Sequence, residues 1–370
     1  ADRWLLSQFA NPASANAKQC VAISTTPDPT GTYHRYEFAT PGNDYPKLGV
    51  WTDAYNMVIR NFSGGFNLDA IGMERAKMLV GDPTAQAVIF NMSSLHPGIN
   101  AAPGYLPADI DGTPPPAGKP GIIMGHENAF NRYVMFELEH DWSNISNSTL
   151  TLMPFVNTAP FDGNVCNFSR NCVPQPNTTR RVDAFADAQM HRLAFRNFGS
   201  HFTITTSHVV DVNDFPDHAA MRWAELRDSG GGWSVFQEGT FSPDSDYRFL
   251  GSAAMNGNGD IALGYSVSSS TTFPSIRFTG RLASDPLGQM TLPESSIIEG
   301  TGSQTGSDRW GDYSAMVVDP SDDNTFWYST EYVATTGSVN WRTRIASFTI
   351  TPPPPADLQV TLTPIGSTTI

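Results

Sequence analysis

Short runs of β-branched and aromatic residues, separated by Gly, Pro, Asn and Asp, dominate the chain. This pattern is typical of β-strands joined by turns. Helical spacing of apolar residues is convincing only over Asp69–Val80, which we interpret as an insertion between strands. Strands without intervening helices predict antiparallel sheets, arranged as a sandwich or as a radial array.

An internal repeat favours the radial array. Three segments, beginning at Asp44, Asp246 and Asp308, share an acidic residue, an aromatic residue, a glycine and small residues, followed by an Asp or Asn turn and a stronger strand. Looser copies lie at Leu106–Gly112 and Asp187–Phe198. Units of roughly 50–65 residues with about four strands each are typical of β-propeller blades. The sequence therefore predicts an all-β propeller whose innermost strands carry small residues.

We predict six blades, with seven as the alternative. Their boundaries are 1–40, 41–104, 105–178, 179–243, 244–303 and 304–351. The first unit has no obvious inner strand, so we expect that strand to have been cut away or to be supplied from elsewhere. The propeller domain accordingly covers residues 1–351.

Residues 352–370 are expected to lie outside the ring. They begin with four prolines, which form a stiff linker, and Asp357–Pro364 then alternates like one β-strand. We interpret this strand as the start of an immunoglobulin-like module or as an arm that pairs with another sheet.

Charge and cysteine usage restrict the function. Lys and Arg number 22 and Asp and Glu number 36, so the net charge is 22 − 36 = −14. This balance argues against nucleic acid and anionic lipid as partners. No run of 18 apolar residues exists, so no membrane span is expected. Cys166 and Cys172 flank a short polar loop and favour a disulfide over a metal clip, whereas Cys20 is expected to be free and buried.

Three motifs stand out in the sequence: Gly302-Ser-Gln-Thr-Gly, Arg309-Trp-Gly-Asp-Tyr-Ser314 and the run Ile261-Ala-Leu-Gly-Tyr-Ser-Val-Ser-Ser-Ser. They resemble a family of large secreted bacterial proteins. The resemblance covers nearly all of residues 1–350. It implies a secreted or cell-surface β-propeller-like domain, often followed by repeated Ig-like modules, and it implies no particular activity.

The repeat also predicts a site. Residues that precede inner strands cluster at one mouth of a propeller, because every inner strand starts at the same end. We expect a ring of charge there, formed by Asp44, Lys47, Asp246, Arg248, Asp308, Arg309, His191 and Arg192. Such a funnel suits a carbohydrate or an acidic small molecule. The structural alternative is that these charges pair between blades and stabilise the ring.

Metal and catalytic signals are weaker. Oxygen-rich turns at Asp109 and Asp111, and at Asn256, Asn258 and Asp260, suggest a structural Ca²⁺, although tight turns need the same residue types. We expect no other cofactor. The sequence has no His-Glu-x-x-His zinc motif, no Gly-x-Ser-x-Gly elbow and no phosphate-binding glycine loop.

Two functions fit these observations. The first is a non-catalytic extracellular module for adhesion, scaffolding or structure. It would bind a polysaccharide or another extracellular polymer, or neighbouring copies and domains through the C-terminal strand. The alternative is a secreted carbohydrate-active enzyme, either a glycoside hydrolase or a polysaccharide lyase, acting at the central funnel.

Overall fold

The structure is a computed structural model that describes residues 2–12, 14, 16–62, 66–99, 104–213 and 215–351. Strands account for 49% of the chain and helices for 6%, which confirms the all-β prediction. Within the described ranges, no helix has the length and apolarity needed to cross a membrane.

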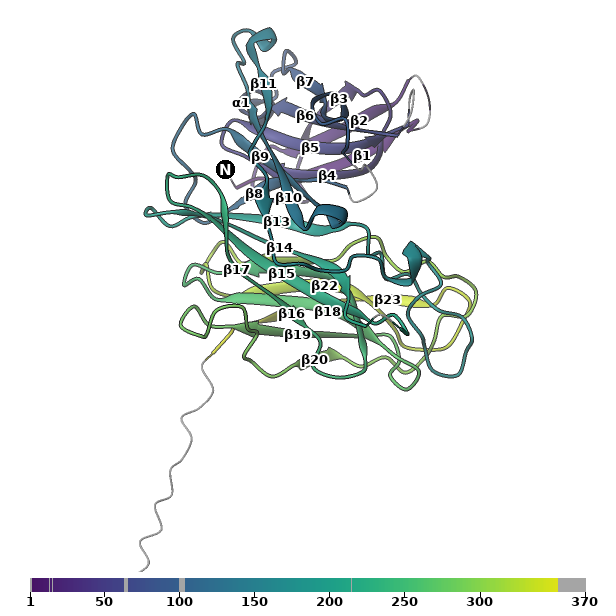
Figure 1. The fold of residues 1–370 in the computed structure, drawn as a ribbon. Coiled ribbons are helices and arrows are strands. Elements are labelled where there is room, and N and C mark those ends of the chain that lie inside the picture. Colours follow the sequence, from purple (N-terminus) through teal and green to yellow (C-terminus); the bar gives the residue numbers. More distant parts are fainter. Residues whose placement is uncertain are drawn as a thin grey trace, which may run out of the picture.

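Six antiparallel sheets follow one another along the chain (Figure 1). The first contains β1 (Leu5–Ala10), β2 (Lys18–Ser24) and β3 (Tyr33–Ala39). The second contains β4 (Asp44–Val50), β5 (Ala54–Asn61), β6 (Asn67–Glu74) and β7 (Ala87–Asn91). The third contains β8 (Leu106–Asp111), β9 (Gly121–Glu127), β10 (Arg132–Glu139), β11 (Thr149–Leu152) and the short β12 (Val156–Asn157).

The remaining three sheets repeat this arrangement. The fourth contains β13 (Gln189–Asn197), β14 (Phe202–Asp211), β15 (Ala219–Asp228) and β16 (Ser234–Phe241). The fifth contains β17 (Tyr247–Met255), β18 (Ile261–Ser268), β19 (Ser275–Arg281) and β20 (Ser295–Ile298). The sixth contains β21 (Ala315–Val318), β22 (Phe326–Val333) and β23 (Trp341–Phe348). Parallel pairing of β8 with β13 joins the third sheet to the fourth.

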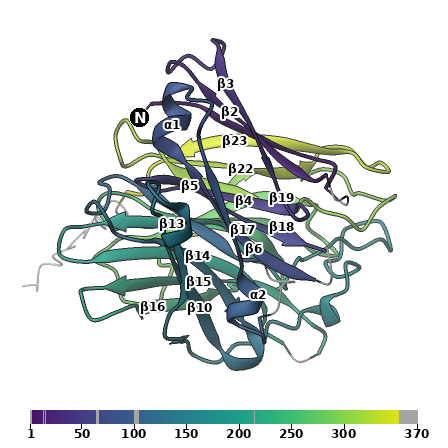
Figure 2. The ribbon, with the colours of Figure 1, turned by 90° about the horizontal axis from the view of Figure 1, so that it is seen from above.

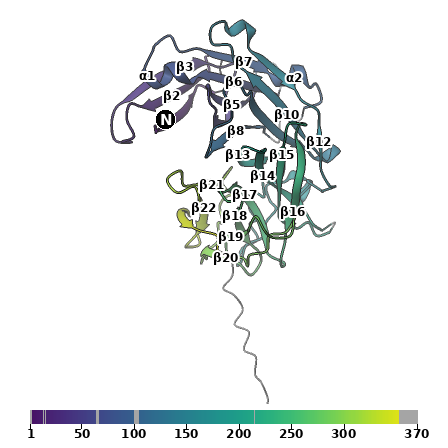
Figure 3. The same cartoon turned by 90° about the vertical axis from the view of Figure 1, so that its left-hand side faces the viewer.

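The sheets are arranged as the blades of a β-propeller. Strands β4, β8, β13, β17 and β21 start the second to sixth sheets, and each lies beside the next around the axis. Five apolar core clusters fill the spaces between consecutive sheets. Val21 of the first sheet packs with Met57 of the second, for example, and Ala262 of the fifth with Met316 of the sixth. Figure 3 shows the result as an arc, with the first and last sheets at its two ends.

Among the described residues, the two end sheets have three strands each, in place of the four predicted for a blade. Strand β3 leads directly into β4, as the outermost strand of one blade leads into the inner strand of the next. Strands β1 to β3 therefore correspond to the second, third and fourth strands of a blade, and none of the described residues forms an inner strand beside β1. The last sheet instead ends at its third strand, β23. Within the described ranges, no core cluster joins the last sheet to the first.

Two smaller predictions are also wrong. The helix expected over Asp69–Val80 is only α1 (Arg75–Val80), because the preceding residues form β6. Strand β6 is buried on both faces, so its apolar residues do not alternate and resemble a helical pattern. The one other α-helix in the described ranges, α2 (Met92–Leu95), lies at the opposite end of the same sheet (Figure 2). Cys20 is free as expected, but it is only partly buried.

The predicted disulfide joins Cys166 to Cys172, with the two Cα atoms 5.6 Å apart. Because the bond closes a short loop, it removes little conformational entropy from the unfolded chain. We expect Cys166→Ala/Cys172→Ala to lower the free energy of unfolding by about 2 kcal/mol, measured by urea denaturation. Cys20→Ala, which leaves the bond intact, is the control. A change of less than about 0.5 kcal/mol in the double variant would contradict this expectation.

Candidate functional site

A cavity of about 840 Å³ opens beside the inner strands. One wall consists of β4 and the neighbouring β1, and the opposite wall is the segment that leads into β21. Side chains from β8 and β13 complete the lining. The residues that contribute are Leu5, Ser7, Gln8, Phe9, Gln19, Asp44, Tyr45, Pro46, Lys47, Leu48, Gly49, Val50, Tyr55, Asp109, His191, Asp312, Tyr313 and Ala315.

Lys47 is the only lysine or arginine among the described residues that line this cavity. Its Nζ atom lies 3.2 Å from the ring centre of Tyr45 and 4.1 Å from that of Tyr313, and it has no hydrogen-bond partner in the described structure. Tyr45 is fixed in place, since its hydroxyl donates to the carbonyl oxygen of Asp312 at 2.9 Å. Burial, followed by the charge of Arg60, lowers the pKa of Lys47 to about 7. The cavity wall therefore carries an amine that is only partly protonated at neutral pH.

Replacing this amine with an apolar side chain should stabilise the protein. The unfolded chain binds a proton at Lys47 up to pH 10.5, whereas the folded chain releases it near pH 7. The wild-type protein therefore gains stability as the pH rises from 7 to 10.5. We expect Lys47→Met to raise the free energy of unfolding at pH 6 by on the order of 3 kcal/mol, since the lost cation–π contacts offset part of the gain.

The advantage of Lys47→Met should shrink towards pH 10.5, which thermal unfolding across the pH range would show. Lys18→Met is the matched control, because Lys18 forms an exposed ion pair with Glu37 on the surface of the first sheet. That control should change stability by less than about 1 kcal/mol at either pH. A destabilised Lys47→Met protein at pH 6 would contradict the expectation.

His191 and Arg192 are adjacent on β13 and have different surroundings. His191 lines the cavity, and burial together with the charges of Lys47 and Arg192 lowers its pKa to about 4. Arg192 is buried and bonds Asp109 at 2.5 Å and Asp111 at 2.7 Å. Its guanidinium thus occupies the position between the two carboxylates where the sequence suggested a calcium ion.

The other proposed calcium turn is also satisfied internally. The side-chain oxygen of Asn256 accepts from the backbone N–H groups of Asn258 and Asp260, and its amide donates to Asp260 and Asn324. Among the described residues, no group of three or more His, Cys, Asp or Glu side chains is placed to hold a metal ion. The structural Ca²⁺ therefore stays a prediction from the sequence.

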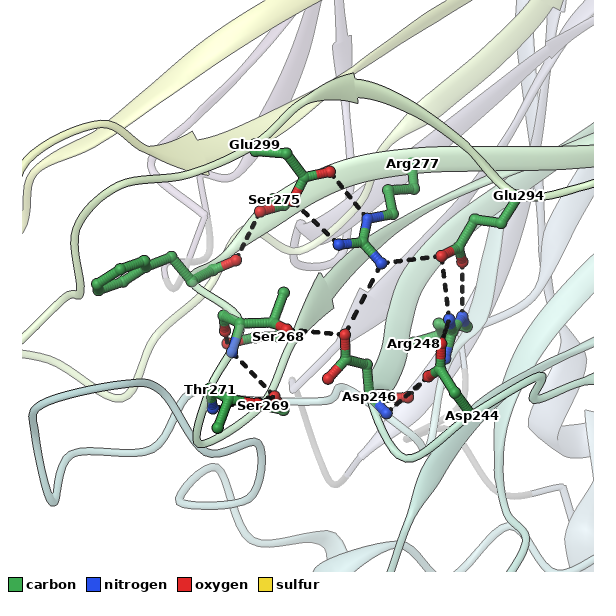
Figure 4. A network of polar contacts seen from close by, with 12 residues as sticks. Asp244, Asp246, Arg248, Ser268, Ser269, Thr271, Ser275, Arg277, Glu294 and Glu299 are labelled. Atoms are coloured by element: carbon green, nitrogen blue, oxygen red, sulfur yellow. Dashed lines mark hydrogen bonds and ion pairs between the residues drawn. The ribbon is translucent and has the colours of Figure 1, made fainter.

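Asp246 and Arg248 belong to a separate network in the fifth sheet (Figure 4). Arg248 is completely buried, and its guanidinium bonds the carboxylates of Asp244 and Glu294. Asp246 accepts from Thr272 and lies 3.7 Å from Arg277. These charges pair with one another within the blade and do not line the central cavity.

Asp308 and Arg309 lie beside the cavity without lining it. The carbonyl oxygen of Asp308 accepts from the backbone N–H of Asp183, and Arg309 forms an exposed ion pair with Asp312 at 2.7 Å. The structure thus brings Asp44, Lys47 and His191 together in the cavity wall. Asp312 and Tyr313, which the sequence analysis did not select, complete it from the same Arg309–Ser314 motif.

The free edge of β1 also faces the cavity. The N–H of Ser24 donates to the carbonyl of Trp4 across the β1–β2 ladder, and hydrogen-bonded pairs alternate along an antiparallel ladder. The backbone groups of Leu5, Ser7 and Phe9 therefore point away from β2. All three residues line the cavity, so its wall includes a row of backbone donors and acceptors without a strand partner in the described structure.

Comparisons with known proteins give no family for this chain. No family profile and no curated protein sequence matches it. Among solved structures, it is similar to an α-L-arabinofuranosidase from Podospora anserina in complex with cellotriose, at 11% identity and a TM-score of 0.35, covering 83% of this chain and 91% of that one.

Two further solved structures are similar to this chain at equally low sequence identity. An α-L-arabinanase from Penicillium chrysogenum has 11% identity and a TM-score of 0.39, covering 84% of this chain and 94% of that one. A Trypanosoma rangeli sialidase has 10% identity and a TM-score of 0.41, covering 89% of this chain and 48% of that one. At such scores these likenesses support neither a ligand nor a reaction for this chain.

Proposed function

We propose that this chain is a non-catalytic binding module of a secreted or cell-surface protein, and that its central cavity holds an extended polypeptide segment. The observation that carries this proposal is the unpaired edge of β1 inside the cavity wall. Exposed strand edges bind extended peptides through main-chain hydrogen bonds, and pockets for alternate side chains add specificity. The Cys166–Cys172 disulfide supports an oxidising compartment.

The charge distribution argues against glycoside hydrolysis in the cavity. That reaction uses two carboxyl groups on either side of the bond, and the acid has a raised pKa. Asp183, Asp187 and Glu331 have pKa values raised by burial, Asp183 to about 6, and none of them lines the cavity. Three carboxylates do line it, those of Asp44, Asp109 and Asp312. Asp109 is bound to Arg192 and Asp312 to Arg309, so only Asp44 has no ion pair in the described structure. The lining therefore offers no two carboxyl groups that are both free of an ion pair.

Edge-directed variants test this function. Proline at position 7 removes the N–H that points into the cavity and leaves the ladder to β2 intact, whereas Ser7→Val keeps that N–H. We expect labelled octapeptides of alternating apolar and polar residues to bind the wild-type protein and Ser7→Val, and to bind Ser7→Pro at least tenfold more weakly. Fluorescence polarisation measures this. Cleavage of any glycan in a broad polysaccharide panel would overturn the non-catalytic assignment.

A carbohydrate ligand is the second candidate. The ring of Tyr313 is 57% exposed at the cavity wall, and it lies in the same lining as Phe9 and the Asp44 carboxylate. An aromatic face beside hydrogen-bonding carboxylates is a usual way to hold a sugar. Tyr313→Ala should then abolish oligosaccharide binding, while Ser7→Pro should leave it unchanged. The two variants thus separate a glycan site from a strand site.

A further inference from the structure

We propose that the cavity is the acceptor for residues 357–363 of a second copy of this chain, which pair antiparallel with β1 and complete the first blade. This inference rests on the proposed function and names its partner. It predicts that copies join head to tail, each through its own cavity and its own C-terminal strand.

The blade architecture defines the position of the missing strand. The second to fifth sheets each have four or more strands, whereas the described residues of the first form no inner strand. That strand would run beside β1 and between β4 and β21, where the 840 Å³ cavity lies. Apolar side chains at both ends of the arc are exposed: Leu6 by 56% on the first sheet, Ile345 by 66% on the last. Neither is covered by a core cluster between those sheets in the described structure.

The donor segment matches the acceptor in length and pattern. Residues 357–363 are seven, as are the residues of β4, next to which the donor would lie. Leu358, Val360 and Leu362 alternate with polar residues in the sequence. The cavity lining includes apolar side chains, such as Leu5 and Val50, and polar ones, such as His191 and Asp312. A strand with one apolar and one polar face can contact both kinds.

The direction of β1 and the length of the linker before residue 357 favour a second copy of the chain as the donor. Strand β1 runs towards the face at which β4 begins, since β3 is parallel to it and leads into Asp44. An antiparallel donor must therefore enter at that face. The chain leaves the propeller at the other face, where Ile350 packs on Gly280 beside the carbonyl of Ile261. A five-residue linker with the proline-rich sequence of 352–356 can reach about 16 Å, which is shorter than the roughly 23 Å length of a seven-residue strand.

Complementary variants of the full chain test the proposal. Ser7→Pro retains the donor strand and loses the acceptor edge. Leu358→Asp/Val360→Asp retains the edge and loses the apolar face of the donor. We expect the wild-type chain to show a mass by light scattering that at least doubles between about 5 and 200 µM, a range typical of single-strand interfaces, and each variant alone to stay monomeric. An equimolar mixture of the two variants should form a dimer that does not grow further. In that dimer the Ser7→Pro chain supplies the only functional donor strand, and the Leu358→Asp/Val360→Asp chain supplies the only functional acceptor edge.

Ser7→Val is the control and should associate like the wild-type chain. A second measurement covers the case in which Ser7→Pro fails to fold: a synthetic peptide of residues 356–364 should dissociate the wild-type oligomer, and the same peptide with Val360→Asp should not. A wild-type chain that stays monomeric throughout, or a mixture that stays monomeric, would overturn the proposal. If such a monomeric chain still binds unrelated alternating peptides through β1, the proposed function stands and only the identity of the partner is wrong.

Discussion

Acidification from pH 7 to pH 4 should remove most of the stability of this propeller, because three histidines, two of them fully buried, must stay neutral in the folded state. His126 and His208 stack at 4.4 Å between the third and fourth sheets, and both are fully buried. Burial lowers the pKa of His126 to about 4, and burial together with His126 and Arg222 lowers that of His208 well below 6.5. His191, in the cavity wall, has a pKa of about 4.

The sign of the effect follows from proton binding. Below pH 6.5 the unfolded chain takes up a proton at each of these rings. The folded chain takes one up at His126 and His191 only near pH 4, and at His208 only well below pH 6.5. Stability therefore falls as the pH decreases through this window, by about 3 kcal/mol at pH 4 for each of His126 and His191. The sum approaches the total stability of an ordinary domain, which is about 5–15 kcal/mol.

Urea denaturation at several pH values would measure this slope. His208→Gln should reduce the slope by one proton between pH 6.5 and pH 4. His201→Gln, which removes a partly exposed ring on the edge of the fourth sheet, should reduce it less. A wild-type stability that is constant between pH 6.5 and pH 4 would show that the rings are protonated in the folded state.

The propeller could be predicted because its repeat encodes a steric requirement. A Cβ atom on Gly49 would lie 2.5 Å from the carbonyl oxygen of Ala108, and one on Gly251 would lie 2.6 Å from that of Gly264. Gly49 thus lies against the inner strand of the next blade, and Gly251 lies against the second strand of its own blade, so neither position has room for a Cβ atom. A requirement of this kind is local in sequence and visible without coordinates.

The ring of charged residues around the cavity could not be predicted in the same way. The face to which a side chain points depends on whether it lies an odd or an even number of residues from a reference position on the strand. Lys47 lies two residues before Gly49, whereas Arg248 lies three residues before Gly251. Successive side chains point to opposite faces of a strand, and both strands carry a bulge at this point. Lys47 therefore lines the cavity and Arg248 is buried inside its own blade. The unpaired edge of β1 could not be predicted for another reason. Every residue type carries the same backbone N–H and C=O groups, apart from proline, so the sequence does not show which of them lack a partner.

Removing Arg248 should strongly destabilise the protein, because its guanidinium joins two carboxylates inside the fifth blade. The buried guanidinium donates to Glu294 at 2.8 and 3.1 Å, to Asp244 at 2.8 and 3.1 Å, and to the carbonyl of Asp246 at 2.7 Å. Burial alone would raise the pKa of Glu294, but the bonds from Arg248 and its neighbours hold it below the usual range. Without the guanidinium, the half-buried Glu294 carboxylate keeps only its bonds from Arg277 (Figure 4) and from the Tyr265 hydroxyl.

We expect Arg248→Met to lower the free energy of unfolding by about 3 kcal/mol, the lower end of the usual cost of breaking a buried ion pair, because Glu294 keeps its ion pair with Arg277 and Asp244 is half exposed. Arg309→Ala, which breaks an exposed pair with Asp312, should cost less than about 1 kcal/mol. Adding Glu294→Gln to Arg248→Met should recover part of the loss, because the neutral amide needs no cation. A double variant as unstable as the sum of its single variants would show that the two groups act independently, and that packing of the arginine stem accounts for the effect.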